Sequence, residues 1–194
     1  MQQHAVTPRG SVLLDEAAIG RTLSRIAHEI IERNDELETV ALVGIHTRGV
    51  PLAQRLRRLV AERAGEELAL GQLDVTFHRD DVHVRRTAPP RHAPVVRETA
   101  LPFEVAGRTV ILVDDVLYTG RTIRAAIDAL FDYGRPARVQ LAVFADRGHR
   151  ELPIRPDYVG KNLPTSKDER VAVQLLEVDE VDAVFLVSPD SSER

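Results

Sequence analysis

The sequence predicts an α/β fold in which helices flank a mainly parallel central sheet. Apolar runs of strand length alternate with amphipathic runs of helix length through residues 1–145, and this alternation is typical of parallel sheets. The segment Val110–Thr122, VILVDDVLYTGRT, shows the unit most clearly, because a β-branched run ends in two aspartates and a turn. The chain has 194 residues, of which 43% are hydrophobic and 29% charged, so we expect a single domain spanning residues 1–194.

The elements before this motif follow from the spacing of apolar residues. Ile19, Leu23, Ile26 and Ile30 recur at helical intervals and predict a helix over Asp15–Asn34. Similar patterns predict three further elements, which are a strand over Thr39–Ile45, a helix over Pro51–Ala64 and a strand over Leu73–Phe77.

Residues 79–102 separate these elements from the motif. The segment is rich in arginine and contains Pro89, Pro90, Pro94 and Pro102. A loop of this length in a compact domain is either functional or disordered. We expect a flexible active-site lid over 79–102, and a disordered linker is the alternative.

The rest of the chain continues the alternation. Apolar runs predict a helix over Ile123–Tyr133 and strands over Val139–Phe144, Val171–Leu175 and Val181–Val187. Residues 146–165 combine glycine, proline and charge, and we expect them to form a hood and a basic segment.

The motif has the residues of a ribose 5-phosphate site. Ligands of parallel α/β sheets bind where strands end and helices begin, and the N–H groups at a helix start hold phosphate. Tyr118–Thr122 would form that cradle, while Asp114 and Asp115 could hold ribose hydroxyls or a bridging Mg²⁺. Simple helix capping by the two aspartates is the alternative. A P-loop is excluded because Asp115 stands where its first glycine is required, and no G-x-G-x-x-G occurs.

Composition excludes several classes of function. The formal net charge of −4 argues against indiscriminate nucleic-acid binding. The absence of cysteine excludes disulfides and thiolate metal sites. No apolar run is long enough to span a membrane and no signal-peptide core is present, so we expect a cytoplasmic protein without a membrane partner. Arginine clusters over 79–97 and 147–161 could bind phosphate, or they could be ordinary solvated surface.

The motif resembles the phosphoribosyl pyrophosphate (PRPP) signature of the type I phosphoribosyltransferases, an apolar strand with two acidic residues and a T-G-x-T loop. Other segments extend the resemblance over Leu13–Val187, and they are TLSRIAHEIIERN, TRG, FHRDD, DALFDYGRP, QLAVFADRGHRELPIRPDYVGKN and PTSK. In this order they resemble the PyrR family of pyrimidine operon regulators. The resemblance implies the type I phosphoribosyltransferase fold, with a small hood built from the terminal segments.

The resemblance also implies two activities. One converts uracil and PRPP, accompanied by Mg²⁺, to UMP and pyrophosphate. The other binds pyrimidine-operon mRNA when UMP or UTP is present, and so regulates either transcription termination or translation. Homodimers or homotetramers are implied as well. A salvage enzyme without specific RNA binding and a regulator that has lost turnover are the alternatives.

Residue roles are carried over position by position. Within the T-R-G loop, Gly49 permits unusual backbone geometry and Arg48 supplies charge for pyrophosphate. Tyr118 stands where purine enzymes commonly have aspartate, which favours a pyrimidine substrate. The implied catalytic residues are Asp114, Asp115, Arg48 and Arg79, with Asp114 and Asp115 also meeting the metal. The implied PRPP and nucleotide contacts are Thr47, Arg48, Asp114, Asp115, Val116, Leu117, Tyr118, Thr119, Gly120, Arg121 and Thr122. The implied base contacts are Arg147, Tyr158 and Val159, and the implied RNA contacts are Ser24, His28, Arg150, Arg155 and Lys161.

Overall fold

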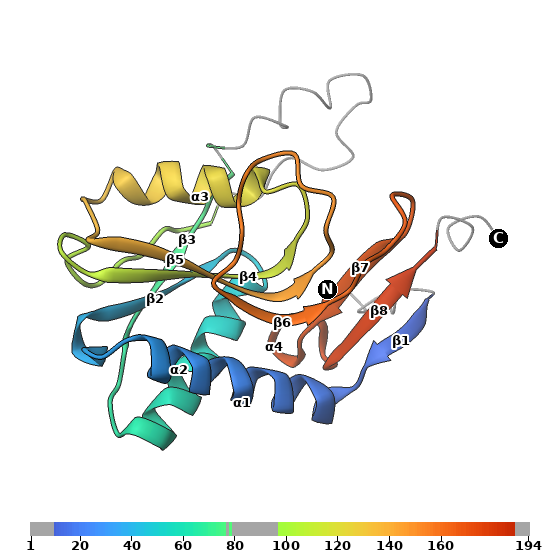
Figure 1. Cartoon of the computed structure of the whole chain (residues 1–194), viewed down its shortest axis with the longest axis horizontal. Coiled ribbons are helices and arrows are strands. Elements are labelled where there is room, and N and C mark those ends of the chain that lie inside the picture. The colour runs from blue at the N-terminus through green and yellow to red at the C-terminus, as the bar shows by residue number, and fades with distance from the viewer. Residues whose placement is uncertain (1–9, 77, 79–96, 189–194) are drawn as a thin grey trace, which may run out of the picture.

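A parallel sheet forms the centre of the computed structural model, which describes residues 10–76, 78 and 97–188 (Figure 1). Within these residues the sheet has five strands in the order β3-β2-β4-β5-β6, and every neighbouring pair is parallel. The strands are β2 (Val40–Ile45), β3 (Ala69–Leu73), β4 (Thr109–Leu117), β5 (Arg138–Asp146) and β6 (Tyr158–Asn162). The predicted α/β architecture with a mainly parallel sheet is confirmed.

Helices cover both faces of this sheet. The helices α1 (Glu16–Arg33) and α2 (Gly49–Ala64) pack on one face, and α3 (Arg121–Phe131) lies on the other (Figure 1). Because side chains alternate along a strand, β4 sends Ile111 toward α1 and α2 and Leu112 toward α3. A 3-10 turn, η1 (Leu37–Thr39), leads into β2. None of the helices in the described ranges is long and apolar enough to cross a membrane.

The terminal segments form a hood at the carboxyl end of the sheet (Figure 1). The antiparallel strands β1 (Ser11–Leu14), β8 (Ala183–Val187) and β7 (Arg170–Gln174) pair in the order β1-β8-β7, and the short helix α4 (Leu176–Asp179) connects β7 to β8. Val173, Leu175 and Val184 join the buried cluster beneath α1 and α2. The expected hood from terminal segments is therefore present and is packed onto the main core.

Several boundaries differ from the predictions. Residues 158–162, expected in the hood segment 146–165, form the edge strand β6 of the main sheet. The strand predicted over Leu73–Phe77 lies earlier in the chain, because β3 spans Ala69–Leu73. The motif strand is longer than its apolar run, because backbone pairing with β5 continues through Val116 and Leu117. Sequence analysis missed β1 and α4 altogether.

The expected lid lies mostly outside the described residues, which resume at Arg97. Its predicted carboxyl end, residues 97–102, is tied down. Gln72 and Ala100 exchange backbone hydrogen bonds of 2.9 Å, and the Asp74 N–H donates to Thr99 Oγ1 at 3.0 Å. The Arg97 N–H donates to Asp74 Oδ2. These contacts fix residues 97–100 beside β3, so a flexible segment would have to end before Arg97.

Candidate active site

The turn after β4 forms a cradle at the start of α3. A cavity of about 330 Å³ lies over it, lined by Asp114, Val116, Leu117, Tyr118, Thr119, Gly120, Arg121, Thr122, Ile123 and Glu151. Gly120 precedes the helix with φ of +94°, a value that suits glycine. Gly120 supplies no side-chain cap, and the Arg121 N–H makes a long contact of 3.4 Å with Thr119 Oγ1. Such a helix start attracts anions.

The loop after β5 braces this cradle. Arg150 donates to Asp146 Oδ2 at 2.6 Å, to the Tyr118 carbonyl at 2.9 Å and to the Ile154 carbonyl at 3.1 Å. The Glu151 N–H donates to the Thr119 carbonyl at 3.0 Å, and the Glu151 carboxylate pairs with Arg121. Arg150 was expected to contact RNA, but its guanidinium is occupied inside the protein, and this expectation is not supported.

Arg147 connects the cradle to the segment that leads into β7. Its guanidinium lies 4.0 Å from the centre of the Tyr118 ring, a cation–π contact. It also donates to Thr165 Oγ1 at 2.8 Å and to the Lys167 carbonyl at 2.9 Å. Arg147 is buried by these contacts, and it holds Tyr118 and the hood connection in one arrangement.

The two aspartates point to different cavities. Asp114 is buried and lines the cradle, and its Oδ1 accepts the Asp115 N–H at 2.9 Å. Asp115 lines a second cavity of about 410 Å³, and its Oδ1 accepts the Val116 N–H at 2.8 Å. Burial raises the pKa of Asp115, and the positive charge of Arg48 opposes this rise. Val116 lines both cavities, so they meet at the end of β4.

The loop between β2 and α2 brings Arg48 to the second cavity. Thr47 follows a cis peptide after His46, and Gly49 begins α2 directly against β4. A Cβ on Gly49 would lie 2.2 Å from the Val113 carbonyl oxygen, so only glycine fits there. Arg48 shares the second cavity with Asp115 and pairs with Asp179 of α4. This hydrogen bond with Asp179 raises the pKa of Arg48.

The expected base contacts Tyr158 and Val159 do not reach either cavity. Tyr158 is fully buried in the core, where its hydroxyl donates to Gln140 and accepts from Asn34, both at 3.0 Å. The Val159 carbonyl accepts a hydrogen bond of 2.8 Å from Arg25 on α1. The expectation fails because this segment is a strand of the main sheet.

The hood strand β7, rather than residues 158 and 159, lines the second cavity. Residues 170–174 and Asp179 form the wall of the second cavity opposite Asp115 and Val116. The strand itself was predicted over Val171–Leu175, but its place at this cavity and the role of Asp179 were not. The acidic residues of LEVDEVD, which follow β7 and face arginines of α2, were the available signal.

The remaining RNA candidates are on the surface around α1 and β6. His28 is exposed and lies 3.2 Å from Glu32, while Ser24 accepts a hydrogen bond of 2.6 Å from Arg63. Arg155 and Lys161 are also exposed. Since Arg25 of α1 bonds to the Gly160 carbonyl, the helix and the edge strand are direct neighbours.

Comparisons with known proteins agree with this geometry. The family model described as "Phosphoribosyl transferase domain" matches residues 10–180. A "Bifunctional protein PyrR" from Deinococcus radiodurans is 55% identical over 185 residues, covering 95% of this chain and 98% of that protein. One from Roseiflexus sp. is 59% identical over 176 residues, covering 90% and 93%.

Solved structures show the same fold at low identity. A hypoxanthine phosphoribosyltransferase from Staphylococcus aureus superposes with a TM-score of 0.69 at 18% identity, covering 95% of this chain and 94% of that one. The enzyme of the same name from Trypanosoma cruzi gives 0.68 at 17% identity, covering 92% and 97%.

Proposed function

Since the chain belongs to the PyrR family and carries a phosphoribosyl transferase domain, we propose that it converts uracil and PRPP to UMP and pyrophosphate and binds pyrimidine-operon mRNA in the presence of uridine nucleotides. The cradle carries this proposal. A helix start without a side-chain cap, beside the buried Asp114 and the half-buried Asp115, suits a ribose 5-phosphate, and two cavities meet where the sugar would lie.

The substrate would lie across both cavities. The 5-phosphate would bind the N–H groups at the start of α3, and the ribose hydroxyls would face Asp114 and Asp115. Mg²⁺ commonly binds through one or two carboxylates together with substrate phosphates, and these two side chains fit that demand. When bound, the ion would neutralise charge on the pyrophosphate.

The reaction would replace one bond to C1 of the ribose with another. The C1–O bond to pyrophosphate breaks as C1 bonds to N1 of uracil, which gives up its proton. Positive charge develops on the sugar and negative charge on the leaving pyrophosphate, so a fixed cation beside that group lowers the barrier. Thr47 and Arg48, in the loop that ends at Gly49, would take this role, and Arg48 lines the second cavity. Arg79, expected to assist them, lies outside the described residues and stays a prediction.

Uracil would bind between the end of β4 and the hood strand β7. In the order β1-β8-β7, β7 is an edge strand, so one side of its backbone has no partner strand among the described residues. Backbone N–H and C=O groups on the outer side of an edge strand can pair with the N–H and C=O groups of a pyrimidine. Tyr118, held by Arg147, would close the cavity on the side of the cradle.

The surface around α1 and β6 is the proposed RNA site. His28, Arg155 and Lys161 are exposed there, and single-stranded RNA loops expose bases that such side chains can contact. We place the protein in the cytoplasm, where mRNA and PRPP are available, and propose a homodimer or homotetramer, which light scattering would establish.

Two substitutions separate the activities. Asp115→Asn should reduce UMP formation at least 100-fold, because it removes a charge beside the reacting sugar, and should leave RNA binding within about twofold. Arg155→Gln should do the reverse, weakening leader-RNA binding several-fold with normal turnover. Arg124→Gln, exposed on α3 across the sheet, serves as a surface control for both. Equal damage to both activities by both substitutions would contradict separate sites.

A further inference from the structure

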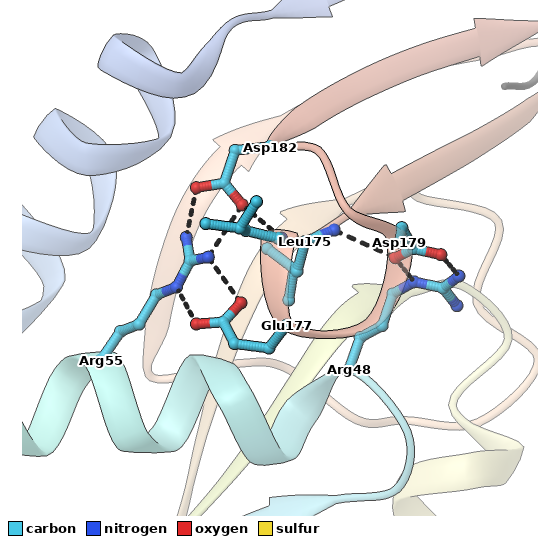
Figure 2. Close-up of polar contacts among 7 residues, drawn as sticks. Arg48, Arg55, Leu175, Glu177, Asp179 and Asp182 are labelled. Carbon is cyan, nitrogen blue, oxygen red and sulfur yellow. Dashed lines mark hydrogen bonds and ion pairs between the residues drawn. The ribbon is translucent and has the colours of Figure 1, made fainter. Parts of the chain in front are cut away.

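Arg48, just before α2, and Arg55, within α2, reach the turn that follows β7 (Figure 2). Arg55 makes two bidentate pairs, with Glu177 at 2.6 and 2.8 Å and with Asp182 at 2.7 and 2.8 Å. Arg48, two helical turns earlier, makes one bidentate pair with Asp179 at 2.6 and 2.9 Å. The same turn of the hood is therefore bound to α2 at two points.

The Arg55 pairs attach the hood to the core. Arg55 lines neither of the two cavities of the site, and its side chain is 13% exposed. Asp182 also accepts the Leu176 N–H at 2.8 Å, which fixes the turn itself. The Arg55 pairs therefore hold the turn that contains α4 against α2 independently of Arg48.

The Arg48 pair lies in the second cavity. The Asp179 carboxylate is 12% exposed and is itself held, because its Oδ2 accepts the Leu175 N–H at 3.0 Å. Arg48 uses Nε and Nη2 for this carboxylate (Figure 2). A guanidinium has five N–H donors, so the donors on Nη1 and the second one on Nη2 remain for a ligand. No hydrogen bond from Nη1 to another described residue is present.

We propose that Asp179 is a positioning residue that holds Arg48 so that its remaining donors face the leaving pyrophosphate. This rests on the proposed function, in which Arg48 binds that group. Arginine has many rotamers, and fixing one of them on binding costs entropy. If Asp179 fixes the orientation of Arg48 before the substrate binds, this cost does not weaken substrate binding. The Asp115 carboxylate across the same cavity would otherwise compete for this cation, since the two side chains are close enough to influence each other's pKa.

The test compares Asp179→Asn with Asp182→Asn, its matched control on Arg55. For Asp179→Asn we expect the KM for PRPP and the inhibition constant of pyrophosphate to rise about tenfold, because the amide N–H₂ faces Arg48 Nη2 and breaks the bidentate pair. The Kd for UMP, which lacks pyrophosphate, should stay within twofold. Asp182→Asn should lower Tm and leave all three constants within twofold.

Each other outcome overturns the inference. Equal weakening of UMP and pyrophosphate by Asp179→Asn would show that the residue acts only through the shape of the hood. Tighter binding of PRPP would show that Asp179 competes with pyrophosphate for Arg48. Unchanged constants would show that Arg48 needs no partner.

A second variant separates this inference from the function on which it rests. If Arg48→Gln leaves the KM for PRPP unchanged, the pyrophosphate role of Arg48 fails. If Arg48→Gln raises that KM and Asp179→Asn does not, only the role of Asp179 fails. In the double variant, Asp179→Asn should add less than twofold to the effect of Arg48→Gln, because it acts through that side chain.

Discussion

Asp115 lies two residues before the end of β4, with its carboxyl group in the cavity beside the hood, and burial there raises its pKa. In the proposed reaction the same group must be ionised to hold sugar hydroxyls or Mg²⁺. Arg48 in the same cavity favours the ionised form, but burial outweighs it. The residue is thus placed for binding at a cost to the free energy of folding, as is common at functional sites.

This cost predicts how stability depends on pH. A carboxyl whose pKa is raised on folding keeps its proton to a higher pH in the native state than in the unfolded state. The free energy of unfolding therefore falls as pH rises from the ordinary carboxyl pKa to the raised value, and it stays lower above that value. Asp115→Asn removes the penalty. We expect its Tm at pH 7 to exceed that of the native chain, and each 1 kcal/mol of penalty removed raises Tm by about 2–4 °C in a domain of this size.

Asp182→Asn is the matched control, because the pKa of Asp182 is shifted in the opposite direction. Burial opposes ionisation of Asp182, but its hydrogen bonds from Arg55 and the Leu176 N–H outweigh burial and lower its pKa. That variant should therefore lose stability at pH 7, and both differences should shrink as pH falls through the carboxyl range. Thermal melts between pH 2 and 7 measure both, because the Asp182 difference shrinks only below the ordinary carboxyl pKa of 3.8. A lower Tm for Asp115→Asn at pH 7 would contradict the predicted penalty.

Single residues also mark where sequence reasoning stopped. The motif residues Asp114–Thr122 could be proposed as a site because they are neighbours in the chain, and most of them line one cavity in the structure. Tyr158 could not, since its role depends on Asn34 and Gln140, whose hydrogen bonds with it show only in the folded chain. The residues next to Tyr158 in the sequence do not indicate whether its side chain is buried in the core or contacts a base.

At the scale of elements, the sequence predicted best those helices and strands whose buried side is apolar along its whole length. The helix α1 begins and ends within one residue of the predicted range, because Asp15 and Asn34 cap a full apolar stripe. Edge elements were harder. The strand β6 contains Lys161 and Asn162, and β1 is four residues long and largely exposed, so neither has the period of a half-buried strand. Both depend on backbone pairing with distant strands.

The contact between α2 and β4 gives a prediction at this scale. Gly49→Ala would place a Cβ 2.2 Å from the Val113 carbonyl oxygen, in backbone that cannot yield cheaply. We expect a loss of about 1–3 kcal/mol in the free energy of unfolding, as for other overpacked sites, together with a higher KM for PRPP because the Arg48 loop moves away from Asp114.

Gly20→Ala is the matched control. Gly20 lies within α1, and a Cβ there meets nothing within 4 Å. Alanine in a helix interior is favoured over glycine by about 0.5–1 kcal/mol, so this variant should gain stability and keep its kinetics. Urea unfolding and initial rates test the pair. A Gly49→Ala protein with native stability and native KM would show that α2 can slide along β4 without affecting the site.

At the scale of the whole molecule, the cradle and the proposed RNA surface are joined through the sheet. Arg150 links the Tyr118 carbonyl to Asp146 at the end of β5. The strand β5 pairs with β6, where Asp146 lies opposite Asn162. Arg25 then bonds β6 to α1 through the carbonyls of Val159 and Gly160. A nucleotide bound in the cradle as proposed would therefore contact a loop that is bonded, in three steps, to the helix that carries His28.

This connection predicts that UMP tightens RNA binding. Binding of the pyrimidine-operon leader RNA, measured with and without UMP across a salt series, should show at least tenfold higher affinity with UMP and discrimination against an unrelated RNA. Since the chain has a net charge of −4, only a local group of cations can contact the RNA phosphates. The logarithm of the binding constant should therefore fall with the logarithm of salt concentration by about 0.7 for each of a few phosphate contacts on a single strand. Arg150→Gln should retain binding in the absence of UMP and lose most of the tightening. Weak binding that ignores UMP and falls steeply with salt would leave the phosphoribosyltransferase activity without the regulatory one.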